Sequence, residues 1–183
     1  MAILLKRISH ILLVLILFSS ECFSQDPTFS QFYANPLYLA PSFAGATEDY
    51  RLSMHYRNQW PEVPGVFHTY SISFDKALVD FNSGIGVLAT YDVAGSGDLS
   101  TTNIGLLYSY DISINEDWHV RPGVNFKFTY LGLNIYKLIF NSQMTGSGTV
   151  PSVYPPPFDN VADVDFATSA VVYNDRFWGG FTL

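Results

Sequence analysis

The stretch Tyr50–Trp60, YRLSMHYRNQW, decides the fold. Its even-numbered positions are nearly all apolar or aromatic, with Leu52 and Met54 at the centre, whereas its odd-numbered positions, from Arg51 to Gln59, are polar or charged. Successive side chains of a β-strand point to opposite faces, so this pattern predicts a strand with one apolar and one polar face. Its length also exceeds the average strand of soluble proteins, which has about five or six residues.

Other parts of the chain carry the same alternation. It is clear in Thr102–Ile112 and Trp118–Tyr130. It is less regular in four further segments, which are Val66–Lys76, Gly84–Val93, Asp163–Asn174 and Phe177–Leu183. No segment has a convincing helical period, so the sequence predicts an all-β protein with about seven strands.

Two all-β architectures compete for these strands. A secreted β-sandwich that binds a ligand buries one face of each sheet, whereas a transmembrane barrel needs strands of about 9 to 11 residues with aromatics near both membrane edges. The apolar rows end in aromatic residues at Tyr50 and Trp60, at Tyr108 and Tyr110, and at Trp118 and Tyr130. We therefore predict that residues 50–183 form an antiparallel outer-membrane β-barrel, with the soluble sandwich as the alternative.

The lengths of the connections give a membrane topology. If the strand at Tyr50 runs outward, Ala77–Ser83, Ser113–Asp117 and Tyr173–Arg176 lie in the periplasm. The longest connection, Leu131–Ala162, then lies outside the cell, as expected for barrels of this class.

The first hairpin has a predicted register. With Pro61–Gly65 as the turn, Trp60 faces Val66 and Arg51 lies opposite Asp75 on the polar face. Because aligned opposite charges support a strand pair, we predict that Arg51 and Asp75 form a luminal pair.

The polar face of this hairpin also contains the residue types of a nucleophilic triad. The register sets His55 across from Ser71, but Asp75 lies four residues beyond Ser71, about 13 Å along the strand, and there is no nucleophile-elbow motif. The remaining histidines and carboxylates lack metal-ligand spacing. We predict no catalytic residue, no cofactor and no metal site.

The start of the chain has the layout of a secretory signal peptide. Lys6 and Arg7 precede the apolar run Ile11–Phe18, and the small residues Cys22 and Ser24 stand three and one positions before Gln25. The run is too short for a membrane-spanning helix, which needs about 20 apolar residues. We predict a signal peptide over residues 1–24 rather than an anchor or a lipoprotein signal, since Glu21 stands where lipidation of Cys22 requires a small residue.

Removal of residues 1–24 leaves an acidic chain without a thiol. The whole sequence has 9 Lys+Arg and 16 Asp+Glu; without Lys6, Arg7 and Glu21 it has 7 and 15, a net charge of −8. An acidic chain is a poor candidate for electrostatic binding of nucleic acid, so we expect no nucleic-acid partner. The low charged fraction, 14% against 16% aromatic, is unusual for a soluble surface, where about a quarter to a third of residues are charged.

The next segment, QDPTFSQFYANPLYLAPSFAG, is rich in aromatics and has three prolines. We expect residues 25–49 to be a periplasmic or plug segment that the prolines keep extended, with a turn at Asn35–Pro36. Its aromatics need apolar cover, so the segment is predicted to pack against the periplasmic mouth of the barrel or to enter the lumen.

Three quoted stretches resemble one family. The segment above, YRLSMHYRNQWPEVPGVFHTYSISFD and LGLNIYKLIFNSQ are similar to the PorP/SprF proteins of the Bacteroidetes type IX secretion and gliding machinery. The residues that carry the resemblance are Asn35, Pro36, Phe43, Gly45, Arg57, Asn58, Gln59 and Trp60.

This resemblance implies a non-enzymatic outer-membrane protein that supports export or surface attachment of secreted proteins. Its implied partners are outer-membrane lipid, periplasmic components of the secretion and gliding machinery, and a secreted adhesin or other surface protein. A porin-like solute channel is the alternative, with Arg51, Arg57, Arg121 and Lys127 favouring anions. Family members are longer and their barrels close with an even number of strands, so we expect this chain to be the N-terminal part of a longer protein.

Overall fold

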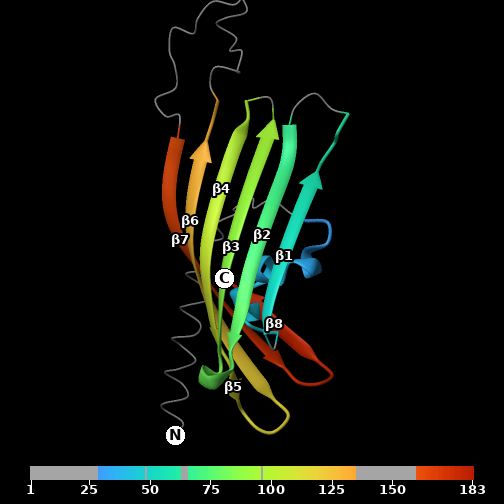
Figure 1. Cartoon of the computed structure of the whole chain (residues 1–183), viewed down its shortest axis with the longest axis vertical. Helices are drawn as coiled ribbons and strands as arrows, with labels where there is room; N and C mark the ends of the chain where they lie inside the picture. The colour runs from blue at the N-terminus through green and yellow to red at the C-terminus, as the bar shows by residue number, and fades with distance from the viewer. Residues whose placement is uncertain (1–28, 48, 63–65, 96, 135–159) are drawn as a thin grey trace, which may run out of the picture.

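A computed structural model describes residues 29–47, 49–62, 66–95, 97–134 and 160–183 (Figure 1). The predicted signal peptide, the centre of the first turn and residues 135–159 lie outside these ranges. The described residues form one antiparallel sheet in which successive strands are neighbours, and the sheet curls like half a barrel (Figure 1). Its strands are β1 (Tyr50–Asn58), β2 (Val66–Leu78), β3 (Ser83–Gly95), β4 (Leu99–Tyr110), β5 (Ile112–Ser113), β6 (His119–Gly132), β7 (Asn160–Tyr173) and β8 (Trp178–Thr182).

This architecture confirms the predicted all-β fold. The predicted strands are all present, with ends shifted by a few residues. Within the described ranges, no helix is long and apolar enough to cross a membrane.

The two faces of the sheet differ sharply in polarity. On the outer face, paired positions form continuous apolar rows across the strands, and the two central rows are Leu52, Phe74, Val87, Leu106, Phe126 and Phe166, then Met54, Ile72, Ala89, Ile104, Phe128 and Val164. A tyrosine-rich row lies on one side, with Tyr56, Tyr70, Tyr91 and Tyr130, and Tyr50 and Tyr108 lie on the other.

This outer face matches the lipid-facing surface of a barrel. Tyr50 and Tyr56 are six residues apart in β1, about 20 Å at the rise of a strand, and the apolar band of outer-membrane barrels is about 25 Å tall. Nearly all the large side chains of the band are exposed, including Met54 at 71% and Leu106 at 59%. The alternation read from Tyr50–Trp60 therefore corresponds to a continuous apolar surface on this side of the sheet.

The register predicted for the first hairpin is confirmed. Arg51 pairs with Asp75 and Leu52 with Phe74, and the register continues to Asn58 and His68. The chain then departs from the prediction, because β1 ends at Asn58 and Trp60 has a positive φ of 52°. Its ring packs edge-on against Phe67, 5.4 Å away, instead of continuing the outer apolar row.

The segment expected as one strand over Thr102–Ile112 is interrupted at Asp111. Ser109 pairs with Gly123 and Ile112 with Val120, so the same register sets Tyr110 opposite Pro122. Proline has no backbone N–H to donate, and the ladder breaks there into β4 and β5.

The N-terminal segment is not extended, contrary to the prediction. It forms three short helical turns, η1 (Phe32–Ala34), α2 (Pro36–Leu39) and η2 (Pro41–Phe43). Pro36 and Pro41 stand at the first positions of α2 and η2, where the fixed φ of proline suits a helix and its missing N–H costs nothing. A further turn, η3 (Val79–Phe81), connects β2 to β3.

Candidate functional site

The inner face of the sheet has one row that contains only small residues. This row is Ala77, Gly84, Ser109, Gly123, Ser169 and Thr182, one residue from each strand from β2 to β8 except β5. It crosses the sheet near the end where β1 begins, since the Ala77 N–H donates to the carbonyl of Asp49, the residue before β1. The turn η2 of the N-terminal segment packs against β4, β6 and β7 over this row.

The segment and the sheet approach each other at backbone distance. A Cβ atom at Gly84 would lie 2.0 Å from the carbonyl oxygen of Ala44, and one at Gly123 would lie 2.3 Å from the backbone nitrogen of Ser42. Neither position has room for a side chain. The small-residue row therefore allows the backbone of the segment to lie directly against the sheet.

Polar groups of the sheet bond mainly to the backbone of the segment. The Ser109 hydroxyl donates to the Ala44 carbonyl at 2.6 Å, and the backbone N–H of Ser42 donates to the Ser169 hydroxyl at 2.9 Å. The side chains of Ser42 and Ser169 also bond to each other. Because these hydrogen bonds involve backbone groups, they depend on the backbone conformation of the segment more than on its side chains.

Arg51 and Asp75 form the most connected part of this site. The Arg51 guanidinium makes two bonds of 3.0 Å to the Asp75 carboxylate, which also accepts the Gly45 N–H at 2.8 Å. Arg51 donates in addition to the Phe43 carbonyl at 3.0 Å. Asp75 is 1% exposed and Arg51 22%, so this ion pair joins β1, β2 and the segment in a largely dry setting.

Asn35 holds the other end of the segment and is fully buried. Its side-chain amide donates to the Ser71 hydroxyl at 2.9 Å and accepts from Ser73 at 3.4 Å. The backbone carbonyl of Asn35 accepts the N–H of Tyr38 at 3.0 Å, and this bond begins the turn at Asn35–Pro36.

Only part of the segment's apolar surface is covered. Leu37 and Ala44 pack with Leu88 and Leu107 of the sheet in a small buried cluster. Phe29 is also buried, whereas Phe32 and Tyr33 are 55% and 66% exposed. The expectation that all its aromatics need cover is therefore wrong for these two.

The triad residue types do not assemble into a catalytic arrangement. His55 and Ser71 are cross-strand partners, but the Ser71 hydroxyl is bonded to Asn35 and the Asp75 carboxylate to Arg51. Among the described residues, none is a hydrogen-bond partner of the buried Nε2 of His55. Across the described parts of the chain, no cluster of three or more potential metal ligands occurs.

A second polar cluster surrounds Asp111, where β4 gives way to β5. Its carboxylate accepts bonds from Arg121 at 2.7 Å and from the Tyr173 hydroxyl at 2.5 Å, and His119 lies at 3.3 Å. His119 and Arg121 follow Asp111 by 8 and 10 residues, whereas Tyr173 lies 62 residues beyond it, and the sequence analysis did not group these residues. The cluster ties β6 and β7 to the point where the β4 ladder breaks.

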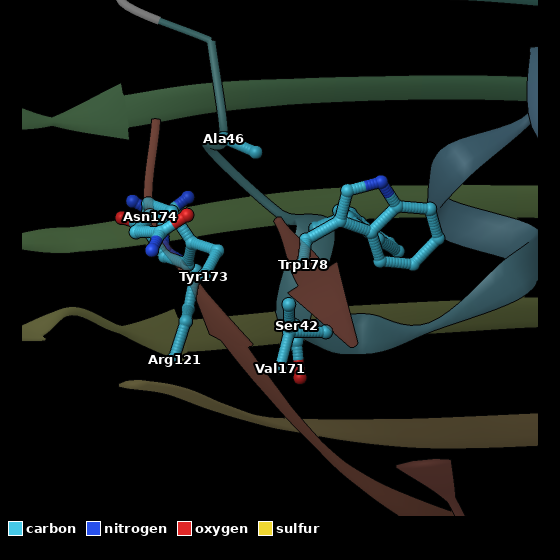
Figure 2. A pocket seen from close by; sticks show the side chains of 8 residues that line it. Ser42, Ala46, Arg121, Val171, Tyr173, Asn174 and Trp178 are labelled. Atoms are coloured by element: carbon cyan, nitrogen blue, oxygen red, sulfur yellow. The ribbon is translucent and has the colours of Figure 1, made fainter. Parts of the chain in front are cut away.

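A pocket of about 250 Å³ lies between η2 and the hairpin of β7 and β8 (Figure 2). Arg121 and Tyr173 line it on one side, and Phe43 and Trp178 meet edge-on at 5.8 Å. Its volume is below the typical range for small-molecule sites, about 300 to 1,000 Å³. The residues that line it also contact one another, Phe43 with Trp178 and Arg121 with the Tyr173 ring.

The predicted signature residues fall into two separate groups. Asn35, Pro36, Phe43 and Gly45 all belong to the docked segment. The others lie at the opposite end of β1, where Asn58 pairs with His68 and the Gln59 N–H donates to the Phe67 carbonyl at 3.0 Å. Nothing in the sequence revealed which sheet residues receive the segment, because glycine and serine at inner positions look like ordinary polar-face residues.

Comparison with protein families identifies the chain. Residues 21–183 match the family described as type IX secretion system membrane protein PorP/SprF. This chain belongs to the PorP/SprF family. Membership makes it an outer-membrane component of type IX secretion, in agreement with the apolar band and its tyrosine rows. PorP/SprF is a family of secretion-system membrane components and is not known as enzymatic. No curated protein and no solved structure matches the chain.

Proposed function

We propose that this PorP/SprF protein supports the export or surface attachment of secreted proteins, and gliding motility where the secreted partner is an adhesin. The match to the family over residues 21–183 carries the proposal. The partners are periplasmic components of the machinery and a secreted adhesin or other surface protein. No chemical step is assigned to the protein, and no cofactor is required.

In this proposal, the N-terminal segment acts as a plug at the periplasmic end of the barrel. Its contacts with the small-residue row and with the pair of Arg51 and Asp75 support this role, since they hold it against the polar inner face. The same contacts set the start of β1, because the segment leads directly into Tyr50.

The porin-like alternative finds less support on the inner face. Three of the cations that suggested an anion channel are paired with carboxylates: Arg51 with Asp75, Arg121 with Asp111, and Lys127 with Asp165. Arg57 also has an interaction partner. The soluble sandwich requires a second sheet to cover the apolar face, and the described residues form a single sheet with that face exposed.

Deletion of the gene in the native bacterium tests the proposed role. We expect the loss of secretion or of surface display for proteins that carry a type IX C-terminal signal, restored by the wild-type gene. A periplasmic protein that uses only the general export route serves as the control. Unchanged secretion and display of every such protein would contradict the proposal.

Conductance in planar bilayers separates the plug from an open channel. We expect the wild-type protein to be closed and a variant lacking residues 29–46 to conduct. Steady conductance by the wild type would instead favour the porin-like function.

A further inference from the structure

The outer face contains a depression that the polar inner face and the proposed function do not explain. In the row that contains Met54 and Ile72, β3 contributes the small residue Ala89. In the neighbouring tyrosine row, β4 contributes Thr102, whereas β1, β2, β3 and β6 contribute tyrosines. Ala89 pairs with Ile104 and Tyr91 with Thr102, so the two small residues are diagonal neighbours on adjacent strands.

This arrangement leaves a hollow of about 480 Å³ over β1 to β4. Its walls are apolar and aromatic and include Met54, Ile72 and Ile104. The volume lies within the range of small-molecule sites, about 300 to 1,000 Å³. Ala89 and Thr102 are less exposed than the side chains around them, as expected for the floor of a hollow.

Polar groups lie along one edge of the depression, in a single row across the strands. Tyr56, Tyr70 and Tyr91 follow one another across β1, β2 and β3, with ring centroids 4.9 Å and 6.5 Å apart. The Tyr56 hydroxyl lies 3.0 Å from Nδ1 of His68. Tyrosines in such a position sit at the boundary between acyl chains and head groups.

We propose that this depression is a binding site for one outer-membrane phospholipid, whose acyl chain lies over Ala89 and whose head group meets the tyrosine hydroxyls and His68. The depression is continuous with the lipid-facing surface of a protein that resides in the outer membrane, so acyl chains are the apolar groups that reach it. A flexible chain also fits a hollow between bulky side chains. The proposal rests on the membrane location and is independent of the role in secretion.

The surrounding sheet disfavours a protein occupant. The floor residues Ala89 and Thr102 lie in β3 and β4, which are paired on both sides, so an added strand finds no free backbone groups there. A transmembrane helix packs closely where several small residues line up, whereas here two small residues are enclosed by tyrosine, isoleucine and methionine.

The test uses the full-length protein purified from the outer membrane in mild detergent and examined by native mass spectrometry. We expect the wild type to retain one phospholipid. The Ala89→Phe variant, which fills the depression, is expected to lose at least nine-tenths of this species, roughly a tenfold weakening or more. Val87→Phe introduces the same side chain two residues away on the same strand and the same face but outside the depression, so it should retain the lipid.

Reconstitution into phosphatidylethanolamine vesicles that contain a phospholipid with a diazirine on its acyl chain locates the site. Crosslinks are expected on the peptides around Ile72, Tyr91 and Ile104 in the wild type and in Val87→Phe, and not in Ala89→Phe. Heat-dependent migration on gels confirms that each variant is folded, and Ala89→Leu replaces Ala89→Phe if the latter does not assemble. Equal lipid retention and labelling in all variants would overturn the proposal, as would a copurifying protein or a second copy crosslinked through this patch.

Discussion

The Asp75 carboxylate accepts the backbone N–H of Gly45 at 2.8 Å, although the two residues are 30 positions apart. The same carboxylate takes two bonds from Arg51 on the neighbouring strand. One buried acid therefore aligns the first hairpin and also fixes the end of the N-terminal segment. The luminal pair predicted from the register thus has a third participant, which lies in the segment that precedes the sheet.

Arg51→Ala is expected to lower the free energy of unfolding by about 3 to 5 kcal/mol, because it leaves the Asp75 charge buried with one remaining donor. Denaturant titration in detergent micelles, followed by tryptophan fluorescence, measures this change. Lys127→Ala is the matched control: it also removes a cation paired across two strands, but its partner Asp165 is 58% exposed, so a loss of about 0 to 1 kcal/mol is expected. Equal losses in the two variants would contradict a special role for the Asp75 site.

Gly84→Ala is expected to weaken the docking of the N-terminal segment, since its Cβ would lie 2.0 Å from the Ala44 carbonyl oxygen. Overpacking of this kind costs roughly 1 to 3 kcal/mol. The measurement is the rate at which a maleimide reacts with Ala44→Cys, a fully buried position, in a Cys22→Ser background. Gly179→Ala, whose Cβ would meet no atom of the described ranges within 4 Å, should leave the rate unchanged. We expect a faster reaction in Gly84→Ala, because weaker docking exposes the thiol. An unchanged slow rate would mean that Gly84 does not control the close approach of the segment to the sheet.

Leu106→Arg is expected to destabilise the protein in lipid by about 2 to 4 kcal/mol, because it places a charge in the middle of the apolar band. Tyr50→Arg introduces the same side chain at the edge of the band, where the expected cost is about 0 to 1 kcal/mol. Unfolding from vesicles by guanidinium gives both values. Similar costs at the two positions would show that the band does not face the membrane as described.

Tyr173→Phe removes a single oxygen atom, the one that donates to Asp111 at 2.5 Å. A hydrogen bond to a charged group contributes about 1.5 to 3 kcal/mol, and a loss of this size in the free energy of unfolding is expected. Tyr33→Phe, at a residue that is 66% exposed, provides the control. If both variants keep wild-type stability, the Asp111 cluster does not hold β6 and β7 to the end of β4.

Much of the sheet could be predicted because its information is local. Alternation in Tyr50–Trp60 set the faces of β1, and the short Pro61–Gly65 turn then fixed the register with β2. The break at Asp111 could not be predicted from its own strand, because its cause is Pro122 on the neighbouring strand. The turn at Trp60 was missed for a similar reason, because the Trp60 ring packs against Phe67 on the neighbouring strand.

The N-terminal segment shows the limit of local reading. Its prolines were read as barriers to helix, but Pro36 and Pro41 begin short helical turns. The aromatics indicated packing, yet backbone groups of Phe43, Ala44 and Gly45 make several of the hydrogen bonds to the sheet and to Arg51. The family signature includes Phe43 and Gly45, but a residue pattern does not say which sheet residues their backbone groups contact.

The sequence by itself determined the all-β class, the two faces of the sheet, the first hairpin's register and the resemblance to PorP/SprF, because alternation and family motifs are written along the chain. Only the tertiary structure showed the small-residue row, the docking of the segment on Asp75 and the depression over Ala89. Each of these depends on which residues become neighbours across strands, and that is set by the registers of several pairings together.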